Sequence, residues 1–98
     1  MVKRESKRIE RLKEKMKELQ QGLRGIGPVM RGSIVYIGTK SKQYYLSLNK
    51  NQKTKIIFLG KKKLERAETY LKNYKKVLDI IEKMTIINMK FLKKDIPY

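Results

Sequence analysis

The sequence contains no cysteine and no histidine. The lack of cysteine excludes disulfides, and the lack of both residue types excludes thiolate and imidazole metal sites. A nucleophilic serine usually needs a histidine as general base. Ser33, which follows Gly32, therefore has no such base to activate it. We therefore expect no metal, no cofactor and no enzymatic activity.

Long apolar runs are missing as well. No segment of the sequence approaches the ~20 apolar residues that are needed to span a bilayer. The N-terminal stretch "MVKRESKRIERLKEK" is charged throughout and lacks the apolar segment of a secretory signal. We expect a cytoplasmic protein that has no membrane partner.

Negative charge is scarce in the whole chain and absent between residues 25 and 60. The chain has 26 Lys and Arg residues against 9 Asp and Glu residues, which gives a net charge of +17. Such an excess predicts a polyanionic partner, for which nucleic acid is the main candidate. The acid-free segment carries only basic charges, namely Arg31, Lys40, Lys42, Lys50, Lys53 and Lys55.

A helix is predicted over residues 5–23. Its apolar residues recur at alternating spacings of three and four, which is typical of a narrow coiled-coil seam. These residues are Ile9, Leu12, Met16, Leu19 and Leu23. A stretch with three glycines and a proline follows, and it predicts the end of the helix and a loop.

Residues 33–59 contain three short runs of β-branched and aromatic residues with a period of two. The connections between the runs are too short for parallel crossovers, so we expect a three-stranded antiparallel meander. The segment "NKNQ" (49–52) is predicted to form the turn of the second hairpin. A symmetric closure of that hairpin would place Tyr45 opposite Ile56.

A long helix is predicted over residues 62–94, with a length of about 50 Å. Because a compact domain of this size has a radius of gyration near ~13 Å, the helix needs a cover for its apolar surface. The first helix or a second copy of the chain can supply that cover. A monomeric helical hairpin over one sheet face is the alternative to a homodimer.

We expect the homodimer, with the long helices in coiled-coil contact, because polar Thr85 and Asn88 lie in the apolar seam. Polar seam residues fix the register or the oligomeric state of a coiled coil. The residues expected at the dimer contact are Leu71, Tyr74, Leu78, Ile81 and Asn88. The complete prediction is a single α+β domain over residues 1–98, with the order α-β-β-β-α.

Three lysines lie where the long helix is predicted to begin. They are unfavourable there, because the N-terminal end of a helix already carries partial positive charge. A phosphate group would supply the missing negative charge, whereas the alternative is that the lysines extend into water. We expect an anion site formed by Lys61, Lys62, Lys63 and Arg66.

Three segments occur in a familiar order: "RGSIV", which opens the first strand, "YYLSL" in the second strand, and the stretch from Lys53 to Asn88. In this order they resemble a family of small bacterial and archaeal proteins that is a domain of unknown function. Members carry a cysteine cluster between the first two strands that suggests a small zinc site, whereas this sequence has "IGTKSKQ" there. The resemblance supports the order of the elements and implies no activity and no metal. It rests on Arg31, Gly32, Ser33, Tyr44, Tyr45, Leu46, Ser47, Lys53, Thr54, Tyr74 and Asn88.

The favoured hypothesis is a nucleic-acid-binding protein that contacts the phosphates of duplex DNA with little sequence specificity. Because lysine greatly outnumbers arginine, base recognition by paired hydrogen bonds is less favoured than phosphate contact. An architectural role, or an accessory role for a virus or mobile element, would fit, with a nucleoid location. Two alternatives remain open: an RNA-binding protein, and a helical assembly protein with an acidic partner.

The tyrosines of the predicted strands admit two roles. Tyr36, Tyr44 and Tyr45 could stack on exposed bases, as in proteins that bind single strands on a sheet. Packing in the core and across strands is the ordinary role of such residues, and we expect it here.

Overall fold

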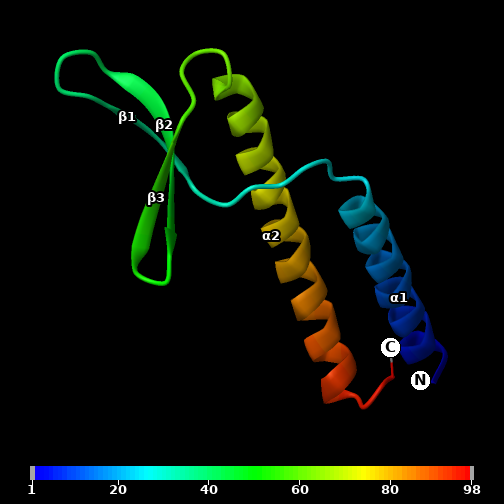
Figure 1. Cartoon of the computed structure of the whole chain (residues 1–98). Helices are drawn as coiled ribbons and strands as arrows, with labels where there is room; N and C mark the ends of the chain where they lie inside the picture. The colour runs from blue at the N-terminus through cyan, green and yellow to red at the C-terminus, as the bar shows by residue number, and fades with distance from the viewer. Residues whose placement is uncertain (1, 98) are drawn as a thin grey trace. The chain divides into compact units, whose positions relative to one another are not determined.

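The computed structural model describes residues 2–97, with side chains from residue 6 onward. It confirms the predicted α+β class and the order α-β-β-β-α (Figure 1). Neither of the helices within the described residues is long and apolar enough to cross a membrane. The elements are α1 (Val2–Arg24), β1 (Ser33–Ile37), β2 (Gln43–Lys50), β3 (Lys53–Phe58) and α2 (Leu64–Lys93).

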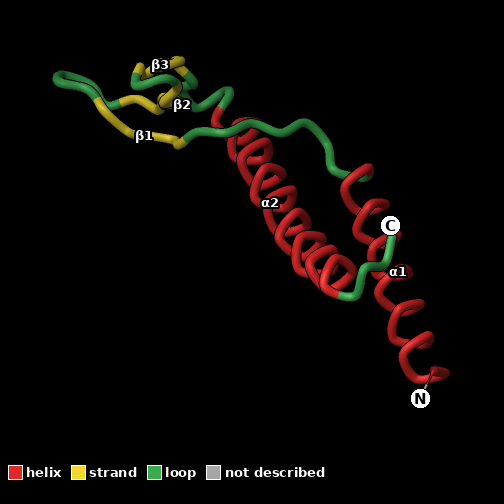
Figure 2. Tube along the Cα trace, turned by 90° about the horizontal axis from the view of Figure 1, so that it is seen from below, coloured by secondary structure: helices red, strands yellow, loops and turns green. Residues whose placement is uncertain are grey.

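The chain forms two compact units, and α2 contributes to both. We call Met1–Ile26 with Lys76–Tyr98 the helical unit, and Gly27–Lys75 the sheet unit. Figure 2 shows the strands of the sheet unit in yellow and the two helices in red. Each unit has its own cluster of buried apolar residues and is described by itself below.

The core of the helical unit lies between α1 and the C-terminal part of α2. Met16 and Leu19 from α1 and Ile87 and Phe91 from α2 form the buried cluster, in which Met16 and Phe91 are almost completely enclosed. The predicted seam of the first helix therefore does face an apolar partner. That partner is a stripe of α2 beside the seam, formed by Met84, Ile87 and Phe91, and Ile80 also packs at the edge of the cluster.

The end of α2 is closed by a C-terminal cap that the sequence analysis did not predict. The N–H of Ile96 donates to the carbonyl oxygen of Phe91 at 2.8 Å, and the N–H of Asp95 donates to that of Leu92 at 3.1 Å. Asp95 has a φ of 56°, so this is a Schellman motif with aspartate in the left-handed position that glycine usually takes. Ile96 packs against the cluster that contains Phe91, as the motif requires.

The sheet unit contains three antiparallel strands in the order β1-β2-β3. One face, which we call the covered face, contains Ile34, Leu46 and Ile57 at paired positions. Leu46 is buried together with Leu59 and with Ala67 of α2. The apolar alternation of the strands thus places the middle of one face, at Leu46, against the first turns of α2. Ile57 on the same face is 57% exposed.

The predicted register of the second hairpin is wrong by two residues. The turn consists of Asn51 and Gln52, which have φ values of 52° and 63°, and Tyr45 pairs with Phe58 instead of Ile56. A turn centred one residue earlier would force Lys50 into the left-handed region, which asparagine tolerates better than lysine. Because the shift is two residues, every side chain keeps its expected face.

Candidate nucleic-acid interface

The ten basic residues predicted to bind nucleic acid are all exposed, but they do not form one cluster. The structure distributes them among the two ends of the sheet, the exposed strand β3, and the turn that leads into α2. They are Arg31, Lys40, Lys42, Lys50, Lys53, Lys55, Lys61, Lys62, Lys63 and Arg66.

The end of the sheet at the β2–β3 turn has two lysines in direct opposition. Lys50 and Lys53 are the last paired residues before the turn, and like charges opposite each other destabilise a strand pair. Arg31 lies at the same end, where its guanidinium donates to the carbonyl oxygen of Asn49 at 3.1 Å. Lys55 lies on the same face as the two lysines, opposite Leu48.

The other end of the sheet collects a second basic group from two separate segments. Lys40 and Lys42 lie in the connection between β1 and β2. Lys61 and Lys62 follow the end of β3 at the same end of the sheet, because the N–H groups of the two preceding residues both donate to the carbonyl oxygen of Tyr44. We call these four lysines the loop-end group.

The turn before α2 requires a correction. Lys61, Lys62 and Lys63 precede the helix, which begins at Leu64 instead of residue 62. The carbonyl oxygen of Lys63 accepts the N–H of Ala67 at 3.0 Å, which makes Lys63 the N-cap residue. A lysine side chain has no acceptor for the free N–H groups of the first turn.

Gly60 makes this turn possible. Its φ of 61° lies in the left-handed region, and a Cβ atom there would come within 3.1 Å of the Phe58 ring. Lys63 and Arg66 line a small hollow of about 170 Å³, and its other lining residues are almost entirely apolar. These are Met30, Leu46, Ile57, Leu59, Ala67 and Tyr70.

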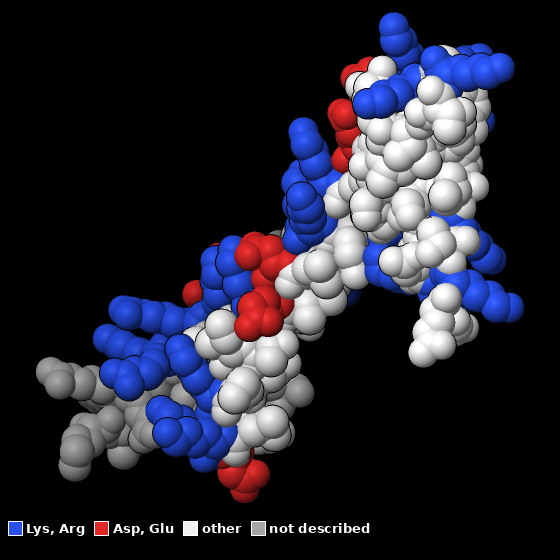
Figure 3. All heavy atoms as spheres, turned by 90° about the vertical axis from the view of Figure 1, so that its left-hand side faces the viewer, with Lys and Arg blue, Asp and Glu red and all other residues white. Residues whose placement is uncertain are grey.

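The face of the sheet opposite α2 has no charged residue on its strands, all of which lie in the described part of the chain. We call it the open face, and Figure 3 shows a white surface at upper right with blue side chains above and below it. Sequence reasoning did not single out this face, although the alternation of the strands contains it. Its residues are Ser33, Val35, Ile37, Gln43, Tyr45, Ser47, Asn49, Thr54, Ile56 and Phe58.

The three strand tyrosines divide between the two faces. Tyr36 and Tyr44 lie on the covered face with stacked rings whose centroids are 4.5 Å apart, and Tyr44 packs against the core. The expectation of core packing is confirmed for Tyr44, and that of packing across strands for all three tyrosines. Tyr45 lies on the open face and pairs across the strands with Phe58 at a centroid distance of 5.6 Å.

The residues predicted for dimerisation have different environments. Leu71 is half-buried against the core of the sheet unit, and Tyr74 is also half-buried. Leu78 and Ile81 are 46% and 47% exposed, and Asn88 is exposed too. Within the helical unit, the seam therefore remains accessible while the neighbouring stripe packs on α1.

One acidic residue of α2 forms an ordinary surface ion pair. Asp79 accepts from Lys83 at 3.0 Å on an exposed surface, as expected for neighbours one turn apart. Among the side chains of residues 6–97, no three acidic groups come together in a way that would hold a metal ion.

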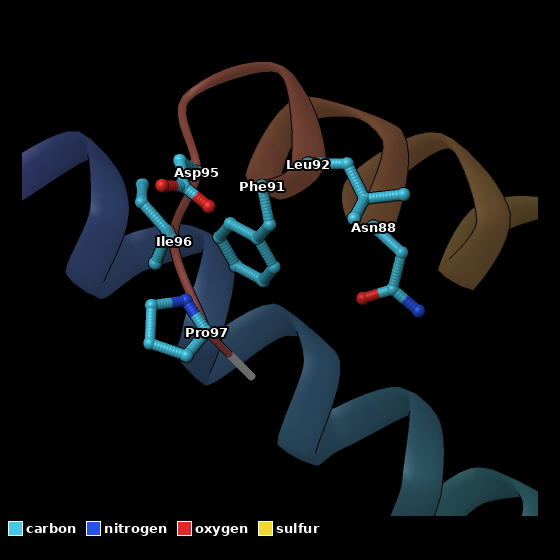
Figure 4. Close-up of a pocket in the computed structure, with 6 residues that line it drawn as sticks. All are labelled: Asn88, Phe91, Leu92, Asp95, Ile96 and Pro97. Atoms are coloured by element: carbon cyan, nitrogen blue, oxygen red, sulfur yellow. The ribbon is translucent and has the colours of Figure 1, made fainter.

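A further hollow lies at the end of α2 in the helical unit (Figure 4). The Phe91 ring lies between the side chains of Asn88 and Asp95, and Leu92, Ile96 and Pro97 complete the lining. Because its only ionised group is a carboxylate, this hollow is unsuited to a phosphate.

No protein-family model, no curated protein and no solved structure matches the chain. The resemblance noted in the sequence therefore stays a prediction.

Proposed function

We propose that this protein binds nucleic acid by contacting phosphates with the basic residues at the two ends of its sheet. The observation that carries the proposal is the direct opposition of Lys50 and Lys53 in a segment with no acidic residue. A like-charge pair of this kind is unfavourable in the isolated protein. A phosphate between the two ammonium groups would turn that repulsion into two charge-assisted contacts.

The separation of the two ends suits a chain of phosphates better than a single anion. β2 has eight residues, so its ends lie about 24 Å apart at about 3.4 Å per residue. The loop-end group stands at one end, and Lys50, Lys53 and Arg31 stand at the other. One small anion cannot reach both groups, whereas a polymer that carries a negative charge every few ångströms can.

Duplex DNA is the polymer we favour, and RNA is the alternative. Lysine contributes most of the basic groups, and its ammonium acts as a point charge without the planar fork that reads guanine. The expected binding therefore depends little on base sequence. An architectural role on DNA, or an accessory role for a virus or mobile element, would fit such binding, and an architectural role would place the protein with the nucleoid.

An anisotropy titration of a labelled duplex of about 20 base pairs tests the proposal. The titration is done at about 50 mM and at about 200 mM salt, because counterion release changes the affinity strongly between these concentrations. We expect micromolar or tighter binding at the lower salt concentration and a loss of two or more orders of magnitude at the higher one. A structured RNA of equal length serves as competitor. Absence of binding at low salt, or an affinity that does not respond to salt, would refute the proposal.

We also propose that the chain forms a homodimer through the exposed seam of α2. Leu78 and Ile81 are about half exposed, and Leu92 is 79% exposed. They share one side of the helix with Thr85 and Asn88 at alternating spacings of three and four, as in a coiled coil. Leu71 packs within its own chain, so the proposal rests on the residues from Leu78 onward.

A further inference from the structure

We propose that the open face of the sheet is a stacking surface for the unpaired bases of a single-stranded nucleic acid, with Tyr45 and Phe58 as its aromatic platform. This inference rests on the proposed function, because the phosphates of the same strand would be held by the basic groups at the ends of the sheet. It adds unpaired strands to the ligands that the proposed function names.

The platform lies on adjacent strands. Tyr45 and Phe58 are directly paired across β2 and β3, and their rings are inclined by 59°. Phe58 is 54% exposed, and Ile56 beside it on the same face is 53% exposed. Aromatic rings on neighbouring strands offer π surfaces to consecutive bases, and such stacking tolerates any base sequence.

The rest of the open face is suited to bases as well. Val35 and Ile37 add apolar surface from β1, and the remaining side chains are uncharged hydroxyl and amide groups. No strand residue on this face carries a charge, although the whole chain has a net charge of +17. An uncharged centre, with the loop-end group beyond one end of the strands, suits a strand whose bases offer flat faces and whose backbone is anionic.

A second copy of the chain is the competing occupant, and the charge pattern disfavours it. Both ends of the sheet are basic, with Lys50 and Lys53 at one end and the loop-end group at the other. The side chains of Lys50 and Lys53 project from the covered face. Two open faces stacked in the same direction would therefore bring together the loop-end groups, which lie in the connections outside the strands. Like charges brought together in this way oppose association, whereas a polyanion is attracted to both ends.

The length of the face sets the expected size of the ligand. Its strands extend over about 24 Å, as estimated above from the eight residues of β2. At about 3.4 Å per stacked nucleotide, a strand needs roughly seven nucleotides to reach from one basic group to the other. A duplex offers only its phosphates to this surface because its bases are already stacked and paired, so the aromatic platform adds affinity only for unpaired strands.

An introduced tryptophan tests the stacking directly, because the chain contains none. Phe58→Trp places a fluorescent indole on the open face, and Tyr36→Trp places one on the covered face at a position that is also 55% exposed. With oligo(dT) of increasing length, we expect strong quenching at position 58 that saturates near seven nucleotides, and little quenching at position 36. Equal quenching at both positions would overturn the inference.

Affinity measurements separate this inference from the proposed function. Tyr45→Leu and Phe58→Leu retain apolar side chains but remove the π surfaces, whereas Tyr45→Phe and Phe58→Tyr retain them. We expect each leucine variant to bind oligo(dT) about ten-fold or more weakly, with duplex binding unchanged. Circular dichroism and thermal melting verify that each variant is folded.

Four outcomes are decisive. Selective loss of single-strand affinity in the leucine variants supports the platform. Equal affinity of all four variants for oligo(dT) overturns it while leaving phosphate binding intact. Failure of the unaltered protein to bind either polymer would overturn the proposed function as well, and a face-to-face dimer that dissociates in Phe58→Leu would assign the open face to a second copy.

Discussion

Tyr45 and Phe58 stand opposite each other across β2 and β3, with ring centroids 5.6 Å apart, on the face of the sheet that α2 does not cover. The direct neighbour of Tyr45 along the chain, Tyr44, points to the other face and packs against the core. Two consecutive tyrosines thus have separate tasks, because successive side chains of a strand alternate between its faces. Both tyrosines are half-buried, Tyr44 by the core of the sheet unit and Tyr45 on the open face beside Phe58.

The N-cap of α2 provides a test in which stability and binding change in opposite directions. Lys63→Ser introduces a hydroxyl that can accept from the free N–H groups of the first turn, so the free energy of unfolding should rise by about 1 kcal/mol. The same change removes one basic group, and affinity for nucleic acid should fall. Thermal melting and anisotropy measure the two effects.

Lys61→Ser is the matched control for this prediction, because it removes the same charge from the turn without changing the N-cap. It should weaken binding to a similar degree and leave the melting temperature nearly unchanged. A gain in stability with no loss of affinity in Lys63→Ser would show that this lysine only extends into water.

The glycine between β3 and α2 should be intolerant of substitution. Gly60→Ala puts a side chain into the left-handed region and against the Phe58 ring, so we expect a loss of about 1–2 kcal/mol in the free energy of unfolding. Gly22→Ala is the control of opposite sign, because Gly22 lies in α1 and its added Cβ would make only an ordinary contact with Ile80. Chemical denaturation should show a gain of up to about 1 kcal/mol for that variant.

Replacement of one residue in the C-terminal cap of α2 by glycine should stabilise the protein. Asp95 has a φ of 56°, and its carboxylate adds negative charge at the negative end of a helix. We expect Asp95→Gly to raise the free energy of unfolding by about 1 kcal/mol. Asp95→Ala removes the charge but keeps the Cβ atom, so the difference between the two variants measures the backbone effect alone. Equal melting temperatures for both would contradict this account.

The dimer proposal is tested by polar substitutions of residues that have similar exposure. Leu78→Gln and Ile81→Gln change seam residues that are 46% and 47% exposed, and Ile86→Gln changes a residue that is 48% exposed but lies outside the seam. Sedimentation equilibrium should show a dimer for the unaltered protein and for Ile86→Gln, and monomers for the seam variants. A monomer at every concentration of the unaltered protein would exclude the dimer.

The sequence was sufficient for the order of the elements because periodicity changes sharply at the glycines around residues 25 and 60. The seam of the first helix and the face assignment of the strands follow from the same periods. The hairpin register did not follow, since it depends on which two residues tolerate a positive φ. Asn51 and Gln52 take that role, and Gln52 is not a residue that turn statistics favour.

The candidate site was predictable in part. The basic residues were evident from composition, but their division between two ends of the sheet required the pairing of the strands. The open face was missed because each of its apolar residues has a credible place in a core. Leu46 is buried against Ala67 of α2, whereas β3 is exposed along its whole length, so that Ile56, Ile57 and Phe58 are all more than half exposed.

The salt dependence of binding to duplex DNA tests the central claim most directly. It is measured as the slope of the logarithm of the association constant against the logarithm of salt concentration. Lys50→Gln with Lys53→Gln removes the opposed pair at the β2–β3 turn. Lys15→Gln with Lys83→Gln removes the same charge from lysines that already pair with Glu18 and Asp79. We predict that the first variant reduces the slope by about 2, one unit for each lost phosphate contact, and that the second leaves it nearly unchanged. Equal slopes for both variants would show that net charge alone governs binding and would contradict a phosphate site at the turn.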